Sequence, residues 1–229
     1  MAMDIRKALN EGIDLMKMKR YSEAEQKFRI IIDVCSQIKQ YPSYPESVHQ
    51  MEAPVLEHLG NSLFMQKRLG EAYLMYTKAL AIYEKKLLHD DVGQARCLQG
   101  LGDVLQFIGD DVDANKYYRQ AETSYEAAGR NEEARYCRES YSVRITRLAG
   151  WVTGVCEDLK KEAGHPDAEV RKQAAYLLGN VSAQTMDPSE PELPVEILKE
   201  LLEKESDPQV RIFAQESLQK LSERKILRL

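Results

Sequence analysis

Residues 59–79 read "LGNSLFMQKRLGEAYLMYTKA" and contain the pattern from which the fold can be predicted. In it, Gly60 is followed by a Leu, an Ala, an aromatic residue and a second Ala at fixed spacings. The same order of small, apolar and aromatic residues recurs around Gly12 and Gly102. A pattern that occurs three times predicts a repeat protein. The aligned sets are Gly12, Leu15, Ala24, Phe28, Ile31; Gly60, Leu63, Ala72, Tyr76, Ala79; and Gly102, Leu105, Ala114, Tyr118, Ala121.

The spacing within each set predicts a pair of antiparallel helices. Ala24, Phe28 and Ile31 are four and three residues apart, which places them on one face of one helix. A Gly or Ala lets two helices approach closely, and the aromatic ring fills the space above their contact.

These positions resemble the tetratricopeptide (TPR) repeat over roughly residues 5–148. The chain departs from the usual motif at Ala8, Leu56 and Leu98, where a Trp is common, and at Glu11, which replaces a Leu. The glycines are 48 and 42 residues apart, compared with about 34 in the usual repeat. We therefore expect long second helices, as in "AYLMYTKALAIYEKKLL" (72–88), and a proline-punctuated connection in "QYPSYPES" (40–47).

Residues 131–148 predict a further helix, which is either a cap on the stack or a degenerate fourth repeat. "AGWVTG" (149–154) then marks a boundary. Beyond it, "GHPDAEVRKQAAYLLGNV" (164–181) aligns with "SDPQVRIFAQESLQKL" (206–221). The matched pairs are Val170 and Val210, Arg171 and Arg211, Ala174 and Ala214, and Leu178 and Leu218.

Asp167 and Asp207 each precede one of these helices and are placed to cap it, and Pro208 suits a first turn. The pattern resembles the HEAT repeat in two copies over residues ~151–222. That resemblance implies that Arg171 and Arg211 form a ladder of charge pairs between repeats. The predicted fold is an all-α, right-handed solenoid of ~10–12 helices, with TPR-like repeats and a capping helix in 1–148 and HEAT-like repeats in 149–229.

Composition excludes several classes of function. The chain carries 32 Lys and Arg against 37 Asp and Glu, a net charge of −5, and a mildly acidic chain is a poor general binder of nucleic acid. No apolar run approaches the ~18 residues of a membrane span, so we expect no membrane partner. Cys35, Cys97, Cys137 and Cys156 show no C-x-x-C spacing, and we expect buried free thiols in the cytoplasm.

We find no catalytic, cofactor or metal motif and predict a protein that is not an enzyme. The strongest metal candidate is "DVDANKYYRQAE" (111–122), which places Asp111, Asp113 and Glu122 at ligand positions of a calcium loop. Lys116 occupies the position where that loop needs Gly, and we expect a helix there. His49, His58, His89 and His165 are isolated in the sequence, and we interpret them as surface or capping residues.

The TPR resemblance implies a concave groove lined by the first helix of each repeat. It places eight candidate contact residues there: Ile13, Met16, Asn61, Phe64, Met65, Arg96, Asp103 and Phe107. Asn61 could bond a peptide backbone, and the apolar members suit an apolar peptide or helix. The alternative is that several of them, above all Phe64 and Phe107, pack as core. Leu9, Ile13 and Gly100 depart from the TPR clamp that binds chaperone carboxylates, which excludes that partner.

We therefore predict a scaffold or adaptor that binds a protein or peptide partner in the groove. The alternatives are a regulatory or substrate-docking subunit of an enzyme complex, or a HEAT-type enzyme with an unrecognised site. Self-association through the apolar C-terminal "KILRL" (225–229) is a further expectation.

Overall fold

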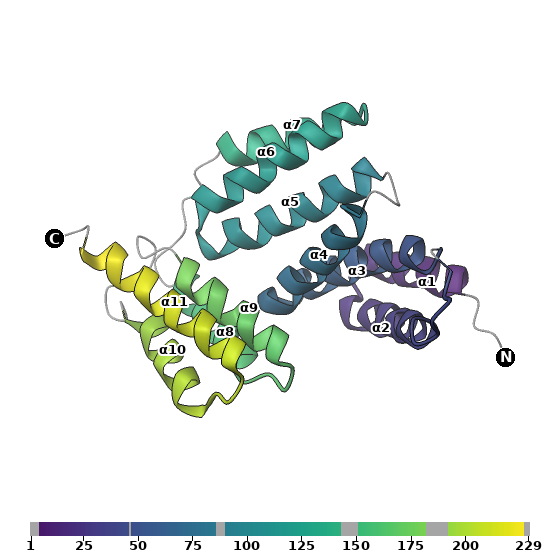
Figure 1. Cartoon of the computed structure of the whole chain (residues 1–229). Helices are drawn as coiled ribbons and strands as arrows, with labels where there is room; N and C mark the ends of the chain where they lie inside the picture. Colours follow the sequence, from purple (N-terminus) through teal and green to yellow (C-terminus); the bar gives the residue numbers. More distant parts are fainter. Residues whose placement is uncertain (1–4, 46, 86–89, 143–150, 182–191, 227–229) are drawn as a thin grey trace.

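The structure is a computed structural model that describes residues 5–45, 47–85, 90–142, 151–181 and 192–226. All regular secondary structure in these residues is α-helical, which confirms the predicted all-α class. From α1 to α7, successive helices pack against one another as the antiparallel pairs of a solenoid, and α8 with α9 and α10 with α11 form two further pairs (Figure 1). The helices are α1 (Ile5–Lys17), α2 (Tyr21–Ile38), α3 (Ser47–Met65), α4 (Leu69–Tyr83), α5 (Asp91–Ile108), α6 (Asp111–Ala127), α7 (Asn131–Ser142), α8 (Trp151–Ala163), α9 (Ala168–Asn180), α10 (Leu193–Lys204) and α11 (Pro208–Ile226).

The repeated Gly and aromatic residues meet across each of the first three helix pairs. A Cβ on Gly12 would lie 2.5 Å from Cε1 of Phe28, and a Cβ on Gly60 would lie 2.8 Å from Cε1 of Tyr76. A Cβ on Gly102 would likewise lie 2.9 Å from Cε1 of Tyr118. The repeated residues Ala24, Ala72 and Ala114 are fully buried. The spacing seen in the sequence therefore reports real contacts between two helices.

The departure from the TPR motif at Glu11 has a local explanation, and one prediction of helix length needs correction. Glu11, which stands where a Leu is usual, pairs with Lys27 of α2 at 2.8 Å, so an ion pair replaces an apolar contact between α1 and α2. The predicted long second helix is wrong in the described part of repeat two, because α4 ends at Tyr83 and Glu84 is its C-cap. The remainder of that prediction, residues 86–88, lies outside the described residues. Much of the extra repeat length belongs to the first helices α3 and α5.

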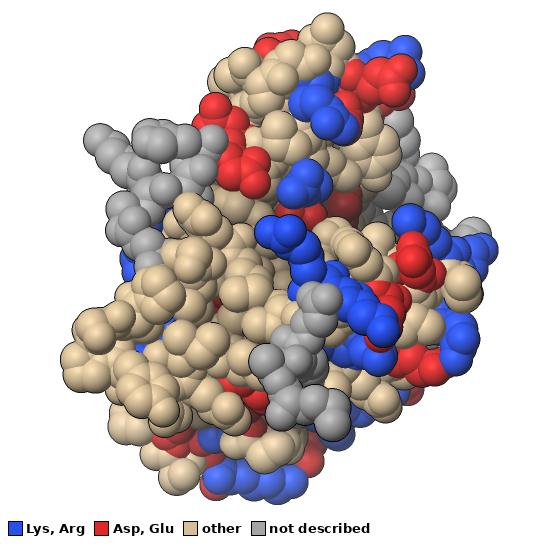
Figure 2. All heavy atoms as spheres, turned by 90° about the vertical axis from the view of Figure 1, so that its right-hand side faces the viewer, with Lys and Arg blue, Asp and Glu red and all other residues tan. Residues whose placement is uncertain are grey.

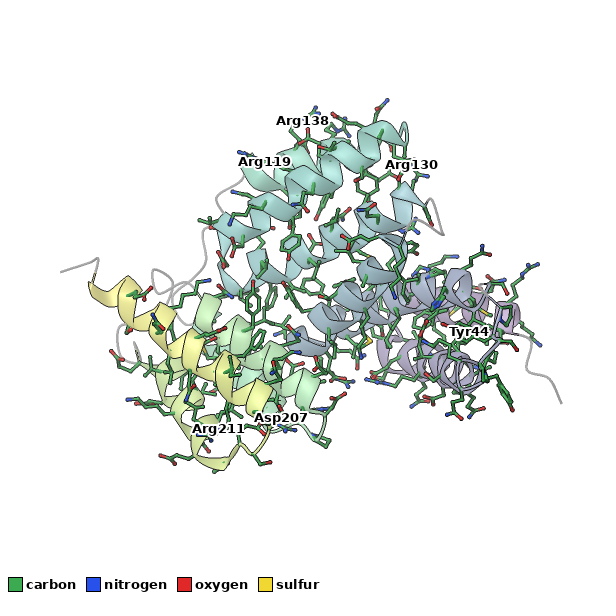
Figure 3. The ribbon with its side chains drawn as sticks, in the orientation of Figure 1. Tyr44, Arg119, Arg130, Arg138, Asp207 and Arg211 are labelled. Carbon is green, nitrogen blue, oxygen red and sulfur yellow. The ribbon has the colours of Figure 1, made fainter. Side chains whose placement is uncertain are left out.

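Helix α7 packs on α6 and covers its outer side (Figure 1). Cys137 of α7 is fully buried in this contact. Arg138 reaches back to Glu122 of α6 at 2.6 Å and to Glu126 at 2.5 Å (Figure 3). Residues 143–150, which include the predicted end of this helix and the predicted domain boundary, lie outside the described residues.

In the C-terminal hairpins α8–α9 and α10–α11, the second helices α9 and α11 are capped as the sequence predicts. Oδ1 of Asp167 accepts a hydrogen bond from the N–H of Glu169, and Oδ1 of Asp207 accepts from the N–H groups of Gln209 and Val210. Helices α9 and α11 cross closely, because a Cβ on Gly179 would lie 2.6 Å from Cβ of Ser217.

Of the two arginines predicted to form a ladder of charge pairs between repeats, only Arg171 does so in the described residues. Arg171 forms a bidentate ion pair with Glu205 of the next hairpin: its Nε donates to Oε2 at 2.6 Å and its Nη2 donates to Oε1 at 2.9 Å. Arg211 instead donates to the backbone carbonyls of Leu202 and Glu205, at 2.7 and 3.0 Å, beside the turn that precedes its own helix (Figure 3). The matching position therefore closes a turn rather than bridging two repeats.

The order of the pairs in space differs from their order in the chain. The C-terminal hairpins follow α7 in the chain, but α8 and α9 pack on α4 (Figure 1). Oε2 and Oε1 of Glu162 accept hydrogen bonds from the N–H groups of Gly70 and Glu71, at 2.7 and 3.1 Å. These are free N–H groups of the first turn of α4, whose N-cap residue Arg68 makes no side-chain cap. A carboxylate from α8 thus supplies the missing cap.

Candidate protein-binding surface

The predicted contact residues belong to the first helices of the three pairs. Ile13 and Met16 lie on α1, Phe64 and Met65 at the end of α3, and Phe107 at the end of α5. Met65 is 51% exposed, and the other four are half-buried. We call these five residues the first-helix surface.

The structure brings two of these residues together and adds a third that the sequence analysis missed. The rings of Phe64 and Phe107 meet edge to face with centroids 5.8 Å apart. The ring centroid of Trp151, the first residue of α8, lies 4.8 Å from that of Phe107. The Nε1–H of Trp151 donates to the Phe107 carbonyl oxygen at 3.0 Å, and the residue is 43% exposed. This aromatic row runs from α3 through α5 to α8. Phe64 and Phe107 are therefore partly core and partly surface.

The polar candidates Asn61 and Asp103 have internal partners. The hydroxyl of Tyr76 donates to Oδ1 of Asn61 at 2.7 Å, and the hydroxyl of Tyr118 donates to Oδ1 of Asp103 at 2.7 Å. Burial raises the pKa of Asp103 to about 6, although the bond from Tyr118 opposes the shift. In the first repeat, Ile13 and Phe28 occupy the corresponding positions. Phe28 has no hydroxyl to donate and Ile13 has no side-chain acceptor, so this hydrogen bond is missing there. The Asn61 oxygen thus accepts one hydrogen bond within its own repeat, and contact between Asn61 and a peptide backbone stays a prediction.

Arg96 is also committed to a neighbour. Its Nε donates to both carboxylate oxygens of Glu57 at 2.9 Å, and the Glu57 side chain is almost fully buried. Burial raises the pKa of Glu57, and Arg96 opposes the shift. About two-fifths of the Arg96 side chain stays exposed, so its outer part borders the surface.

The histidines differ from the surface residues that we expected. His58 stacks on Phe28 with ring centroids 5.8 Å apart. Burial lowers the pKa of His58 to about 4, and the positive charge of Arg96 adds to this shift. His49 is half-buried and lies 3.1 Å from the Tyr44 hydroxyl (Figure 3). His165 lies in the turn before α9, where its Nδ1 accepts from the N–H of the N-cap residue Asp167 at 3.1 Å. His89 lies outside the described residues.

The remaining sequence expectations concern metal, cysteine and membrane. The calcium-loop candidate is helical from Asp111 onward, as we predicted, and the part of the chain that the structure describes contains no group of three metal-ligating side chains. All four cysteines are free and buried, also as predicted. None of the described helices is both long and apolar enough to cross a membrane.

Figure 2 shows acidic and basic side chains interspersed on one face of the molecule.

The fold and this surface define an all-α solenoid of helix pairs with an apolar, partly exposed strip along its first helices. Residues 51–127, about a third of the chain, match the family model described as tetratricopeptide repeat. Among solved structures, the chain is similar to BtubC (BKLC) from P. vanneervenii, with 14% identity and a TM-score of 0.42 over 94% of this chain and 77% of that one. No curated protein matches the chain.

Proposed function

We propose that this protein is a scaffold or adaptor that binds another protein at the first-helix surface. The observations that carry the proposal are the exposure of Met65, which follows Phe64 in α3, and the partly exposed aromatic row of Phe64, Phe107 and Trp151. Exposed clusters of this kind are costly in water and usually mark interaction sites. The TPR match over residues 51–127 supports the same role, because such repeats typically mediate contacts between proteins.

The chemistry of the surface favours a helical partner over an extended one. An extended peptide needs hydrogen-bond partners for its backbone, whereas a helix satisfies its own. The oxygens of Asn61 and Asp103 are engaged by tyrosines, and Arg96 is paired with Glu57. What these first helices offer is mainly apolar contact from Met and aromatic side chains, which adapt to an amphipathic helix.

We also keep the proposal that residues 149–229 form a HEAT-like unit. The Asp caps of α9 and α11 and the bridge from Arg171 to Glu205 support it. In this account the unit has two roles. It holds α4 through Glu162, and it contributes Trp151 to the binding surface.

Site-specific photo-crosslinking tests the proposal. A photoreactive residue is placed at position 65, and a matched control carries it at Glu132, an exposed position on α7. We expect position 65 to crosslink in cells to one discrete protein through a segment of amphipathic helix, and position 132 not to do so. Equal labelling at both positions, or crosslinking at neither, would show that the first-helix surface is not the binding site.

A further inference from the structure

A second surface lies on the opposite helices of the same repeats, between α2 and α4. These helices form the two walls of a groove with a volume of about 580 Å³, and α3 forms its floor. The floor is apolar, with Leu56 and Leu59 almost fully buried, and Ile32 and Ile82 line the walls half-buried. Asp167, at the α8–α9 turn, lies at one end, so the C-terminal hairpins help to shape the groove.

The charges along the groove are unevenly distributed. The α4 side carries Lys78, within the helix, and Lys85, just beyond its end, and neither forms an ion pair with another described residue. On the α2 wall, Arg29 is paired with Glu25 and Glu71, and Asp33 is an exposed carboxylate. The chain as a whole is acidic, with a net charge of −5, and yet the α4 side is basic. The exposed cations of the α4 side therefore favour an anionic group from outside.

The far end of the groove contains polar atoms whose bonding is incomplete. The Glu52 side chain is only 6% exposed; its Oε1 accepts from Lys39 at 2.5 Å, while its Oε2 is buried without a hydrogen-bond partner in the described structure. Nδ1 of His49 lies 3.5 Å away and is equally unsatisfied. Buried polar atoms without partners are rare and costly. These two atoms face each other and are closed to solvent, so they form a buried polar pair beneath this end of the groove.

We propose that this groove binds an acidic amphipathic helix of a partner protein. Its apolar side lies against the half-buried Ile32 and Ile82 above the Leu56 and Leu59 floor, and two of its carboxylates pair with Lys78 and Lys85. The helical part of the α4 wall, from Met75 to Tyr83, is ~12 Å long, which fits a helix of about two turns. This surface is separate from the first-helix surface and does not depend on the function proposed for it.

The test uses a phage library that displays random 16-residue peptides, panned on the immobilised full-length chain. We expect enriched peptides to combine apolar residues at helical spacing with Asp or Glu. One such peptide is then synthesised, and its affinity is measured by calorimetry. The double variant Lys78→Glu/Lys85→Glu should bind it at least about ten-fold more weakly, and added salt should weaken binding to the wild-type chain.

Two control variants separate this groove from other surfaces. Lys116→Glu reverses an exposed charge in the neighbouring groove between α4 and α6, and Met65→Glu changes the first-helix surface. Both should leave the peptide affinity unchanged. If the double variant does not fold by thermal melting, Lys78→Gln/Lys85→Gln replaces it, with a smaller expected loss.

Three outcomes would overturn the proposal. The first is that no acidic amphipathic peptide is enriched. The second is that the enriched peptides bind the lysine variants as well as the wild type, or lose binding with Met65→Glu. The third is that the purified chain associates with itself and the lysine substitutions abolish that association, which would assign the groove to a second copy of the chain.

Discussion

At the scale of single residues, the stack depends on rings that fill the space left by missing side chains. The Tyr76 ring lies between two glycines, because Cβ atoms on Gly60 and Gly100 would lie 2.8 and 2.6 Å from its Cε1. The hydroxyl of the same ring reaches Asn61. One tyrosine thus links α3, α4 and α5.

Gly60→Ala should destabilise the protein by roughly 1–3 kcal/mol, since the added methyl group overlaps the buried Tyr76 ring. The matched control is Gly154→Ala on α8, where a Cβ meets nothing within 4 Å. That change should stabilise by about 0.5–1 kcal/mol, because Ala is the better helix former. Chemical denaturation measures both values. Equal effects of the two substitutions would contradict the packing role of Gly60.

Ala72→Leu and Ala114→Leu test the second fixed position of the repeat. Both alanines are fully buried beneath the neighbouring helix, so the larger side chain should overpack the contact and cost roughly 1–3 kcal/mol in each variant. Thermal unfolding measures the loss. Unchanged melting of both variants would show that close approach at these alanines is unimportant.

At the scale of helices, the first three pairs share one turn. Lys19, Lys67 and Gly109 follow the first helix of each pair and have φ angles of 59°, 60° and 91°. The left-handed region suits Gly and strains residues with a side chain. Two of the three turns therefore use a lysine where glycine fits better.

Lys67→Gly should stabilise the protein by up to about 1 kcal/mol, because it relieves this strain. Lys199→Gly, at an exposed position inside α10, is the control and should destabilise by about 1 kcal/mol. Urea unfolding of the two variants gives the free energies of unfolding. Destabilisation by both would mean that the turn at Lys67 is not strained.

The helices themselves were largely predictable, and their ends were less so. The Gly, Ala and aromatic spacing predicts three helix pairs because each repeated residue makes a contact within its own pair. The same spacing shows that Asp111 and Glu122 belong to a helix. It does not show where α4 ends, since the apolar pattern continues beyond Tyr83 and helix termini depend on local capping.

At the scale of the whole molecule, the sequence could not show how the two sets of repeats pack together. The contact between Glu162 and the start of α4 joins residues more than ninety positions apart, and no periodicity encodes it. Trp151 was missed as a surface residue for the same reason. Its sequence context indicates a boundary, and only the packing of α8 brings it to Phe107.

The stability contributed by Glu162 should depend on pH. Burial raises the pKa of this carboxyl to about 7, although the N–H groups of Gly70 and Glu71 oppose the shift. Because the unfolded chain releases this proton near pH 4.5, the folded state binds more protons between pH 4.5 and 7. Stability from this group is therefore present at low pH and is lost as pH rises, by on the order of 3 kcal/mol.

Glu162→Gln removes that titration. The free energy of unfolding of the variant minus that of the wild type should rise steadily from pH 4.5 to 7. His58, whose lowered pKa gives the opposite slope between pH 4 and 6.5, is common to both chains and cancels in the difference. If the difference instead becomes more negative with rising pH, the ionised carboxylate is a favourable cap, and its pKa is lower than burial indicates.

Binding of a protein at the first-helix surface is tested by comparing the variants Met65→Glu and Arg171→Ala in partner affinity and in melting temperature. The partner captured by crosslinking at position 65 is purified, and its affinity and the melting temperature of each chain are measured. Met65→Glu should weaken binding at least about ten-fold and shift melting by no more than about 2 °C, because Met65 is exposed.

Arg171→Ala should do the reverse. It leaves the buried Glu205 carboxylate without its partner, which costs roughly 2–3 kcal/mol of stability, and it should not change affinity. Full affinity in a folded Met65→Glu variant would contradict the account, since the contact would then lie elsewhere. Unfolding of Met65→Glu would contradict it as well, by showing that Met65 is core.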